Sequence, residues 1–130
     1  MQRTFYKKEK PGKKPEPKPK QFIDKSGNKV WKLNNNYHRV GKPAIEYRNG
    51  DTEWYINGIH HRTDGPAIDK HGIKSWCLNG KYHREDGPAY MAGNREFYYL
   101  NGKYYTKDNF YREIYLRGKI TKEELFIHLL

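Results

Sequence analysis

The chain has little of what most compact domains are built from. Its 130 residues include one cysteine, Cys77, which excludes an internal disulfide and a zinc cluster built from cysteines. No run of about 18 apolar residues occurs, so no membrane span is expected, and the N-terminus lacks the apolar segment of a secretory signal. Leucine, isoleucine, valine and phenylalanine together number 23, a share typical of disordered chains. We expect a soluble, cytoplasmic protein without a membrane partner.

Aromatic residues take the place of the missing aliphatic ones. The chain holds 12 tyrosines and 3 tryptophans, and a few large rings can build a core. Basic residues number 26 and acidic residues 15, so the formal net charge is +11. Composition therefore predicts a folded domain whose charge favours an anionic partner.

Residues 1–20 form a basic arm with eight basic residues, two acidic residues and four of the seven prolines. Lysine–proline alternation buries no apolar area and favours extended chain, so we expect an arm that is disordered or ordered by a partner. Its lysines are expected to contact phosphates or an acidic protein face, and a merely solubilising terminus is the alternative. These lysines are Lys7, Lys8, Lys10, Lys13, Lys14, Lys18 and Lys20. The rest of the positive charge is expected to be spread over residues 21–130.

Residues 21–105 are a tandem repeat with a period of 22 to 23 residues. Three markers recur in register: the dipeptide His-Arg, the dipeptide Pro-Ala, and an aromatic residue before a short apolar-Asn turn. His-Arg begins at residues 38, 61 and 83, Pro-Ala begins at residues 43, 66 and 88, and the aromatic positions are Trp31, Trp54, Trp76 and Tyr98. Segment 23–31 matches segment 68–76 at six of nine places, which aligns Ile23 with Ile68 and starts the repeat near Phe22.

Each unit carries the residues of tight turns. Asn-Gly pairs supply the positive φ that a type I′ hairpin turn needs, and a glycine four residues before each tryptophan predicts a second turn. Asp-Gly-Pro predicts a tight connection in which the aspartate bonds backbone N–H groups. The first unit departs from this pattern, with Asn34-Asn35 for Asn-Gly and Gly41-Lys42-Pro43 for Asp-Gly-Pro, and in the fourth unit Gly93 predicts an altered turn.

The predicted fold is mainly β: tandem antiparallel β-hairpins that form a meandering ribbon of about four units. The residues expected to build the repeat are Trp31, Trp54, Trp76, Asn57, Gly58, Asn79, Gly80, Asn101, Gly102, Asp64 and Asp86.

The pattern W-x-L-N-G-x-x-H-R-x-D-G-P-A, which covers roughly residues 22–107, resembles a MORN-like repeat variant of small proteins in tailed bacteriophages and giant viruses. The resemblance implies a ribbon of stacked antiparallel hairpins and a viral origin. It implies no activity, because the proteins that carry this repeat are mostly without an assigned function.

Residues 106–130 change to a helical pattern. Thr106 offers an N-cap oxygen before apolar residues spaced four apart, and Thr121 with Glu124 forms a capping-box pattern before a second apolar run. We predict two short helices that cap the open edge of the last hairpin. For the second helix, a partner or dimer surface is an equal alternative, formed by Leu125, Phe126, Leu129 and Leu130.

The recurring histidines are the first candidates for chemistry. His38, His61 and His83 should lie on one face, but equivalent positions in successive hairpins are two strands, about 10 Å, apart. That distance is too long for one shared metal ion, and the fourth unit carries Tyr105 at this position. We therefore expect structural histidines, with no metal and no cofactor.

Other reactive residues also have structural explanations. Asp64 and Asp86 have the chemistry of an acid–base pair, but their turns account for them, and each follows an arginine with which it can form a local ion pair. Cys77 lies beside Trp76 in an expected strand, where a small interior residue is the expectation. The sequence contains no phosphate-binding glycine loop and no nucleophile motif. We expect no catalytic residue and no enzyme.

The tyrosines are too many for a thin core. Exposed tyrosine among lysine and arginine is typical of surfaces that stack unpaired bases or bind proteins, and cross-strand ring pairing is the structural alternative. The partner-binding candidates on the ribbon are Tyr55, Tyr82 and Tyr104.

These features predict a non-enzymatic, virus-encoded interaction module. The first hypothesis is that it binds a polyanion, nucleic acid or a nucleoprotein complex, through the basic arm and a second row made by Arg39, Arg62 and Arg84. The alternative is a phage inhibitor or adaptor that binds a host protein or defence complex through its aromatic face and C-terminal helix. A structural virion component is a weaker third hypothesis, and a homo-oligomer is left open.

Overall fold

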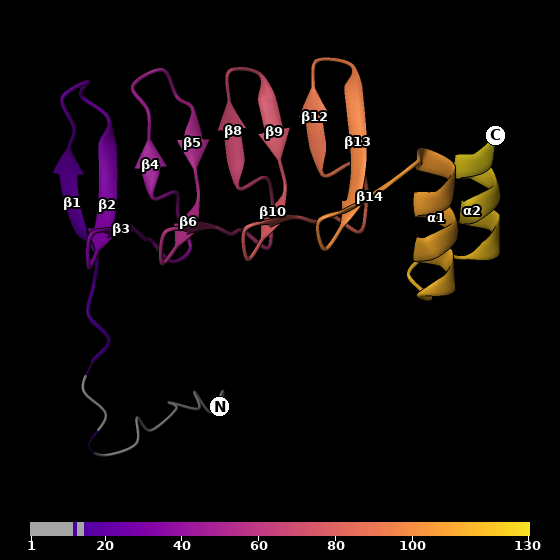
Figure 1. Cartoon of the computed structure of the whole chain (residues 1–130), viewed down its shortest axis with the longest axis horizontal. Helices are drawn as coiled ribbons and strands as arrows, with labels where there is room; N and C mark the ends of the chain where they lie inside the picture. The colour runs from indigo at the N-terminus through magenta and orange to yellow at the C-terminus, as the bar shows by residue number, and fades with distance from the viewer. Residues whose placement is uncertain (1–11, 13–14) are drawn as a thin grey trace, which may run out of the picture.

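The computed structural model describes Gly12 and residues 15–130, and Figure 1 shows a row of side-by-side hairpins that ends in two helices. The predicted mainly β fold, a hairpin ribbon with a short helical end, is confirmed. The predicted state of the arm falls largely outside the described residues, as do the candidate residues Lys7, Lys8, Lys10, Lys13 and Lys14.

The strands divide into four units. The first unit (residues 20–43) contains β1 (Lys20–Ile23), β2 (Lys29–Leu33) and β3 (Asn36–Tyr37), and the second (44–66) contains β4 (Ile45–Glu46), β5 (Thr52–Glu53), β6 (Tyr55–Ile56) and β7 (Ile59–His60). The third unit (67–88) contains β8 (Ile68–Lys70), β9 (Ile73–Ser75), β10 (Cys77–Leu78) and β11 (Lys81–Tyr82), and the fourth (89–105) contains β12 (Tyr90–Ala92), β13 (Arg95–Leu100) and β14 (Lys103–Tyr105). The helices are α1 (Lys107–Leu116) and α2 (Lys122–Leu129).

Each unit contributes two hairpins. The longer hairpins lie side by side in one antiparallel sheet of order β1-β2-β4-β5-β8-β9-β12-β13-β14. The shorter hairpins, β2–β3, β6–β7, β10–β11 and β13–β14, form at the other end of each unit. The chain therefore meanders from unit to unit, and each unit touches mainly its neighbours, as in other repeat arrays.

The Asn-Gly turns adopt the predicted conformation. Asn79 and Gly80 have φ angles of 50° and 78°, both in the left-handed region that a type I′ turn requires. The second and fourth units repeat these values closely, and Asn34 and Asn35 replace the pair in the first unit with φ angles of 50° and 66°. The predicted return of residues 75–78 onto residues 81–83 is confirmed, because Cys77 pairs with Tyr82.

The register of the first strand differs from the sequence alignment. Phe22 pairs with Val30, just as Ile68 pairs with Ser75, so Phe22 and not Ile23 occupies the place of Ile68. The reason is the length of the turn: five residues separate β1 from β2, whereas two separate β8 from β9. The alignment matched identical residues across turns of unequal length, and its pairing of Ile23 with Ile68 is wrong.

The alanines of the Pro-Ala pairs form the joints between units. Ala44, Ala67 and Ala89 are fully buried, and each carbonyl accepts from the backbone N–H of the tryptophan before it, at 2.7 to 2.8 Å. Each alanine N–H donates forward into the next hairpin. Because these alanines are fully buried, a larger side chain at such a joint would have to displace its neighbours.

The helices cover the end of the ribbon at the fourth unit. Phe110 and Ile114 of α1 are completely buried and pack with Tyr98, Leu100 and Tyr111 in the main apolar cluster. The predicted caps are present: Thr106 accepts from the N–H of residue 109, and the capping box of α2 is complete. Among the described residues, no helix has the length and apolar character needed to cross a bilayer.

Candidate functional site

Each of the first three units holds an arginine stacked on its tryptophan. The guanidinium carbon lies 3.6 Å from the ring centre in Arg39–Trp31, 3.9 Å in Arg62–Trp54 and 3.8 Å in Arg84–Trp76. One guanidinium nitrogen also donates to the carbonyl of the proline four residues later, at 3.1 to 3.2 Å. The ring contact and the hydrogen bond together fix each arginine on the face of the ribbon that carries the tryptophans.

Asp64 and Asp86 each accept a hydrogen bond from the arginine of the second and third stack, respectively. Nε of Arg62 donates to Asp64 at 2.8 Å, and Nε of Arg84 donates to Asp86 at 2.9 Å. The predicted local ion pairs are therefore confirmed. The sequence also suggested backbone N–H partners for these aspartates, and the arginine is the partner that both carboxylates share. The same hydrogen bond and charge lower the pKa of Asp64.

The glycine of the turn packs against the same guanidinium. A Cβ atom at Gly65 would stand 2.7 Å from the central carbon of Arg62, and one at Gly87 would stand 3.1 Å from that of Arg84. The arginine row is thus part of the framework. Its side chains are only 18 to 23 % exposed, so these residues are poorly placed for the second row of phosphate contacts that the sequence suggested.

The histidines join each unit to the next. Nδ1 accepts from the backbone N–H of the asparagine in the following turn, at 2.9 Å in His38–Asn57, 3.0 Å in His61–Asn79 and 2.9 Å in His83–Asn101. Tyr105 replaces histidine where no further turn follows. The structural role expected of these histidines is confirmed, and the described residues contain no cluster of three or more metal-ligating side chains.

The candidate tyrosines lie on the opposite face and differ in exposure. Tyr37 packs on Tyr55 with ring centres 5.2 Å apart, and Tyr82 packs on Tyr99 at 5.1 Å. Tyr55 is half-buried, Tyr82 is 37 % exposed and Tyr104 is 55 % exposed. Cross-strand pairing therefore accounts for much of the tyrosine content, and Tyr104 is the candidate with the freest ring.

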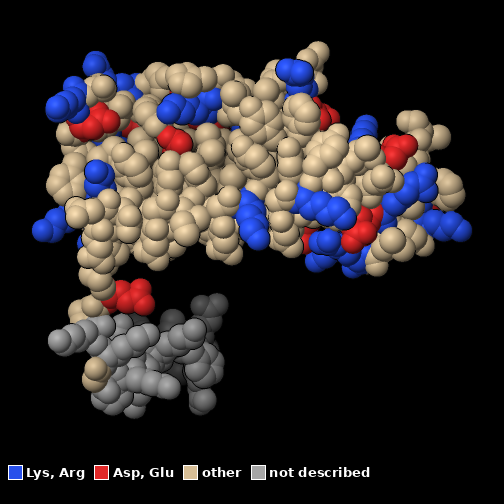
Figure 2. Space-filling model, viewed as in Figure 1, with Lys and Arg blue, Asp and Glu red and all other residues tan. Residues whose placement is uncertain are grey.

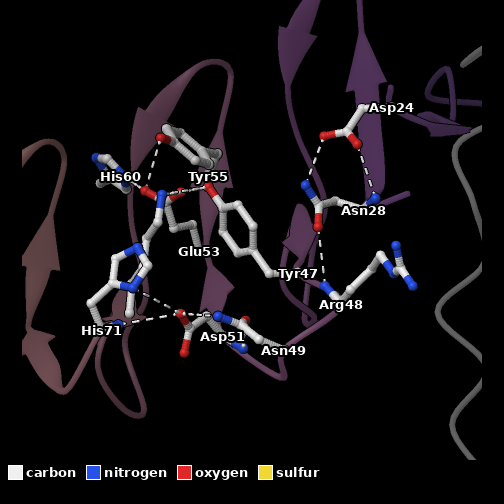
Figure 3. A network of polar contacts seen from close by, with 11 residues as sticks. Asp24, Asn28, Tyr47, Arg48, Asn49, Asp51, Glu53, Tyr55, His60 and His71 are labelled. Atoms are coloured by element: carbon white, nitrogen blue, oxygen red, sulfur yellow. Dashed lines mark hydrogen bonds and ion pairs between the residues drawn. The ribbon is translucent and has the colours of Figure 1, made fainter. Parts of the chain in front are cut away.

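A buried carboxylate interrupts this aromatic face in the second unit. Glu53 is 8 % exposed and lies between Tyr47, Tyr55 and His60 (Figure 3). Nε2 of His60 is 3.0 Å from Oε1, the hydroxyl of Tyr55 donates at 3.3 Å, and Tyr47 donates to Oε2. Lys70 of the third unit donates to the Tyr47 hydroxyl at 2.9 Å.

These partners hold Glu53 ionised. The His60 contact, the Tyr47 hydroxyl and the charge of Lys70 outweigh burial and lower the pKa of Glu53 to about 2. Burial and the neighbouring carboxylate raise the pKa of Tyr47. Sequence reasoning missed this cluster. The available signal was a break in the repeat, because the residue before the aromatic is valine, serine or phenylalanine in the other units.

Cys77 occupies the interior of the third unit. It is 4 % exposed, as the sequence predicted for a small strand residue, and burial raises the pKa of its thiol to about 11. A groove of about 560 Å³ is lined by Trp76 and by Arg62 and Arg84. Its lining includes both Arg–Asp pairs, so these two arginines already have carboxylate partners.

The second helix presents two different faces. Leu125 packs against the cluster of the cap, and His128 stacks on Tyr111 with ring centres 3.7 Å apart. Leu125 is thus part of the cap and not a free contact residue, and Leu129 is half-buried. Phe126 is 60 % exposed, and Ile127 and Leu130 are also exposed. Ile127 was missed because its apolar neighbours hid the helical periodicity.

The opposite end of the ribbon is basic, and among the described residues no helix or further strand covers it. β1 pairs only with β2 and is the edge strand of the sheet. Lys20 of β1 stands directly across from Lys32 of β2, and like charges in this position are destabilising. Neither lysine has a carboxylate partner among the described residues. On β1, Phe22 lies between Lys20 and the turn that leads to β2, and it is 48 % exposed.

The net charge is concentrated in the N-terminal part of the sequence. Residues 1–48 hold 14 of the 26 basic and 4 of the 15 acidic residues, so ten of the eleven net positive charges lie there. Of the net charge of +5 that residues 21–130 carry, residues 21–48 hold +4. At the helical end, basic and acidic groups lie side by side (Figure 2), including the pairs Arg117–Glu113 and Lys119–Glu85.

Comparisons with models of protein families, with curated proteins and with solved structures give no match.

Proposed function

We propose that this protein is a non-enzymatic interaction module that binds a polyanion, a nucleic acid or nucleoprotein complex, at the N-terminal end of its ribbon. The observation that carries the proposal is the position of the charge, since residues 1–48 hold ten of the eleven net positive charges. A polyanion gains most where cations are dense and unpaired, because binding releases its condensed counterions.

The pairing of the arginine row supports a site outside that row. Arg39, Arg62 and Arg84 each have a carboxylate partner within 4 Å. Lys20 and Lys32 stand opposite each other across the strand pair and have no carboxylate partner in the part of the chain that the structure describes. A phosphate at that position would relieve their repulsion, whereas a phosphate at Arg62 would have to compete with Asp64.

The experiment measures binding of the full chain to fluorescein-labelled single-stranded RNA, single-stranded DNA and duplex DNA at two salt concentrations. One variant replaces Lys7, Lys8, Lys10, Lys13 and Lys14 with glutamine. A matched control of equal net charge replaces five basic residues at the helical end with glutamine: Lys103, Lys107, Arg112, Lys119 and Lys122. The first variant is expected to bind more weakly and with less salt dependence, its slope falling by about 0.7 to 0.9 for each phosphate that is no longer neutralised. Equal reductions in both variants would contradict a site at the N-terminal end.

A second candidate function rests on the exposed face of α2. Phe126, Ile127 and Leu130 are 60, 67 and 103 % exposed, and an apolar group of this kind suits a protein contact. The candidate is an inhibitor or adaptor that binds a host protein or defence complex in the host cytoplasm, in keeping with the phage-like repeat pattern. Phe126→Ser should then abolish capture of that protein and leave polyanion binding unchanged.

A further inference from the structure

We infer that the polyanion is a single-stranded nucleic acid, with its phosphates along Lys20 and Lys32 and one base stacked on Phe22. This inference rests on the proposed function and names the ligand class and the contact residues.

The three side chains lie on one face of the first hairpin. Alternate residues of a strand point to the same face, so Lys20 and Phe22 share a face of β1. Lys32 lies opposite Lys20, and Val30 lies opposite Phe22. On the next strand Tyr37 pairs with Lys32, and the Lys32 ammonium is 5.1 Å from its ring centre. The row across the three strands is thus Lys20, Lys32 and Tyr37, with Phe22 two residues along β1 from Lys20.

The charge at this position is particular to the first unit. The residue after the repeated aromatic is Lys32 in the first unit and Tyr55, Cys77 and Tyr99 in the others. Lys32 is half-buried, as Tyr55 and Tyr99 are, but it is the one of the four that carries a charge, and it belongs to the unit whose strand β1 is the edge of the sheet. Its placement opposite Lys20 costs free energy in the unbound protein, and a phosphate between the two ammonium groups removes that cost.

The ring of Phe22 is free for the same reason. Its equivalent in the second unit, Ile45, is 5 % exposed because the first unit packs over it, whereas Phe22 is 48 % exposed. Base stacking on an exposed aromatic ring is the main sequence-tolerant contact that proteins make with unpaired strands. Lys20 lies two residues from this ring on the same strand and Lys32 lies diagonally across from it, so the site combines that contact with phosphate attraction.

A single strand fits this end better than a duplex. A duplex keeps the faces of its bases stacked inside, so it offers nothing to Phe22. A major groove admits a helix, but both helices lie at the far end, where residues 49–130 carry a net charge of only +1.

The test uses the full chain, a labelled oligothymidine of about 12 nucleotides, the same backbone with abasic sites, and a duplex. Phe22→Leu keeps an apolar side chain and removes the ring, Phe22→Tyr restores a ring, and Phe126→Leu is the matched control at the other end. Phe22→Leu should weaken single-strand binding by about 5- to 100-fold with the salt slope unchanged. Phe22→Tyr and Phe126→Leu should bind as the parent chain does, and duplex binding should not respond to Phe22.

A second measurement does not depend on any variant. The unaltered protein should bind the abasic strand more weakly than the intact strand at equal phosphate number. Equal binding of both strands, or a Phe22→Leu variant that binds normally, overturns the stacking inference. If the salt slope of the Lys20→Gln/Lys32→Gln variant still falls by about 0.7 per lysine, the proposed polyanion function stands. Salt-independent binding, or none, overturns both.

Discussion

The backbone N–H of Asn79 donates to Nδ1 of His61 across the joint between the second and third units, at 3.0 Å. The same hydrogen bond recurs at the other two joints. A histidine used in this way accepts through Nδ1 and carries its proton on Nε2. The repeated dipeptide His-Arg therefore has two structural tasks: the histidine binds the next unit and the arginine binds its own.

His61→Ala should lower the unfolding free energy by about 1 kcal/mol, because it removes one hydrogen bond between units. The melting temperature should fall by about 4 °C in a thermal scan. His71→Asn is the control, since His71 lies in an exposed turn with positive φ that asparagine tolerates. Equal and small effects of both variants would mean that the strand ladders alone hold the joints.

Gly65→Ala should destabilise the protein by about 1 to 3 kcal/mol, because its Cβ would overlap the Arg62 guanidinium at 2.7 Å. Gly87→Ala should cost less, since the corresponding distance is 3.1 Å. Chemical denaturation gives both values. In an Arg62→Ala background the cost of Gly65→Ala should largely disappear, and a cost that persists would place the cause in the backbone rather than in the arginine.

Glu53→Gln should remove a pH-dependent part of the stability. The pKa of Glu53 is lowered from 4.5 to about 2, so the folded protein gains from its ionisation. This stability is fully present above about pH 4.5 and is lost as the pH falls towards 2. At neutral pH the variant should be less stable by about 3 kcal/mol, and the difference should vanish near pH 2.

Urea unfolding at a series of pH values measures this difference. Glu123→Gln, an exposed residue of α2, is the control and should follow the parent protein at every pH. If the difference in unfolding free energy between Glu53→Gln and the parent protein is the same at every pH, the packing of the new side chain, and not the lost charge, causes the destabilisation.

Leu125→Ala should destabilise the helical cap by about 1 to 2 kcal/mol, because Leu125 packs against its apolar cluster. Phe126→Ala should leave stability nearly unchanged, because that ring is 60 % exposed. Thermal scans of the two variants separate the covered face of α2 from the free one. The opposite ranking would place Phe126 in the cap.

The turns were predictable because their information is local. Asn79 and Gly80 require no knowledge of the rest of the chain to predict positive φ. The local ion pair of Asp64 was predictable because Arg62 lies two residues before it, whereas the stacking of Arg62 on Trp54 needed the fold. The alignment of Ile23 failed because sequence identity does not measure turn length.

The Glu53 cluster needed the fold. Its partners come from two units, and Lys70 is 17 residues further along the chain, so no short motif contains them. The free edge at Lys20 and Phe22 also became visible only when the sheet order placed β1 outermost. Sequence reasoning found the arm, the repeat and the helical cap at the opposite end, but not the facing of Lys20 and Lys32 across β1 and β2.

The identical joints make the ribbon a spacer of adjustable length. Each joint uses the same histidine, alanine and turn, so one more unit inserted between the second and third would fit both neighbours. Such an insertion would move the basic edge away from the helices by about 10 Å, the width of two strands, and would alter the chemistry of neither end. For a ligand or assembly that touches both ends, the distance between the two contacts would thus change only in steps of one unit.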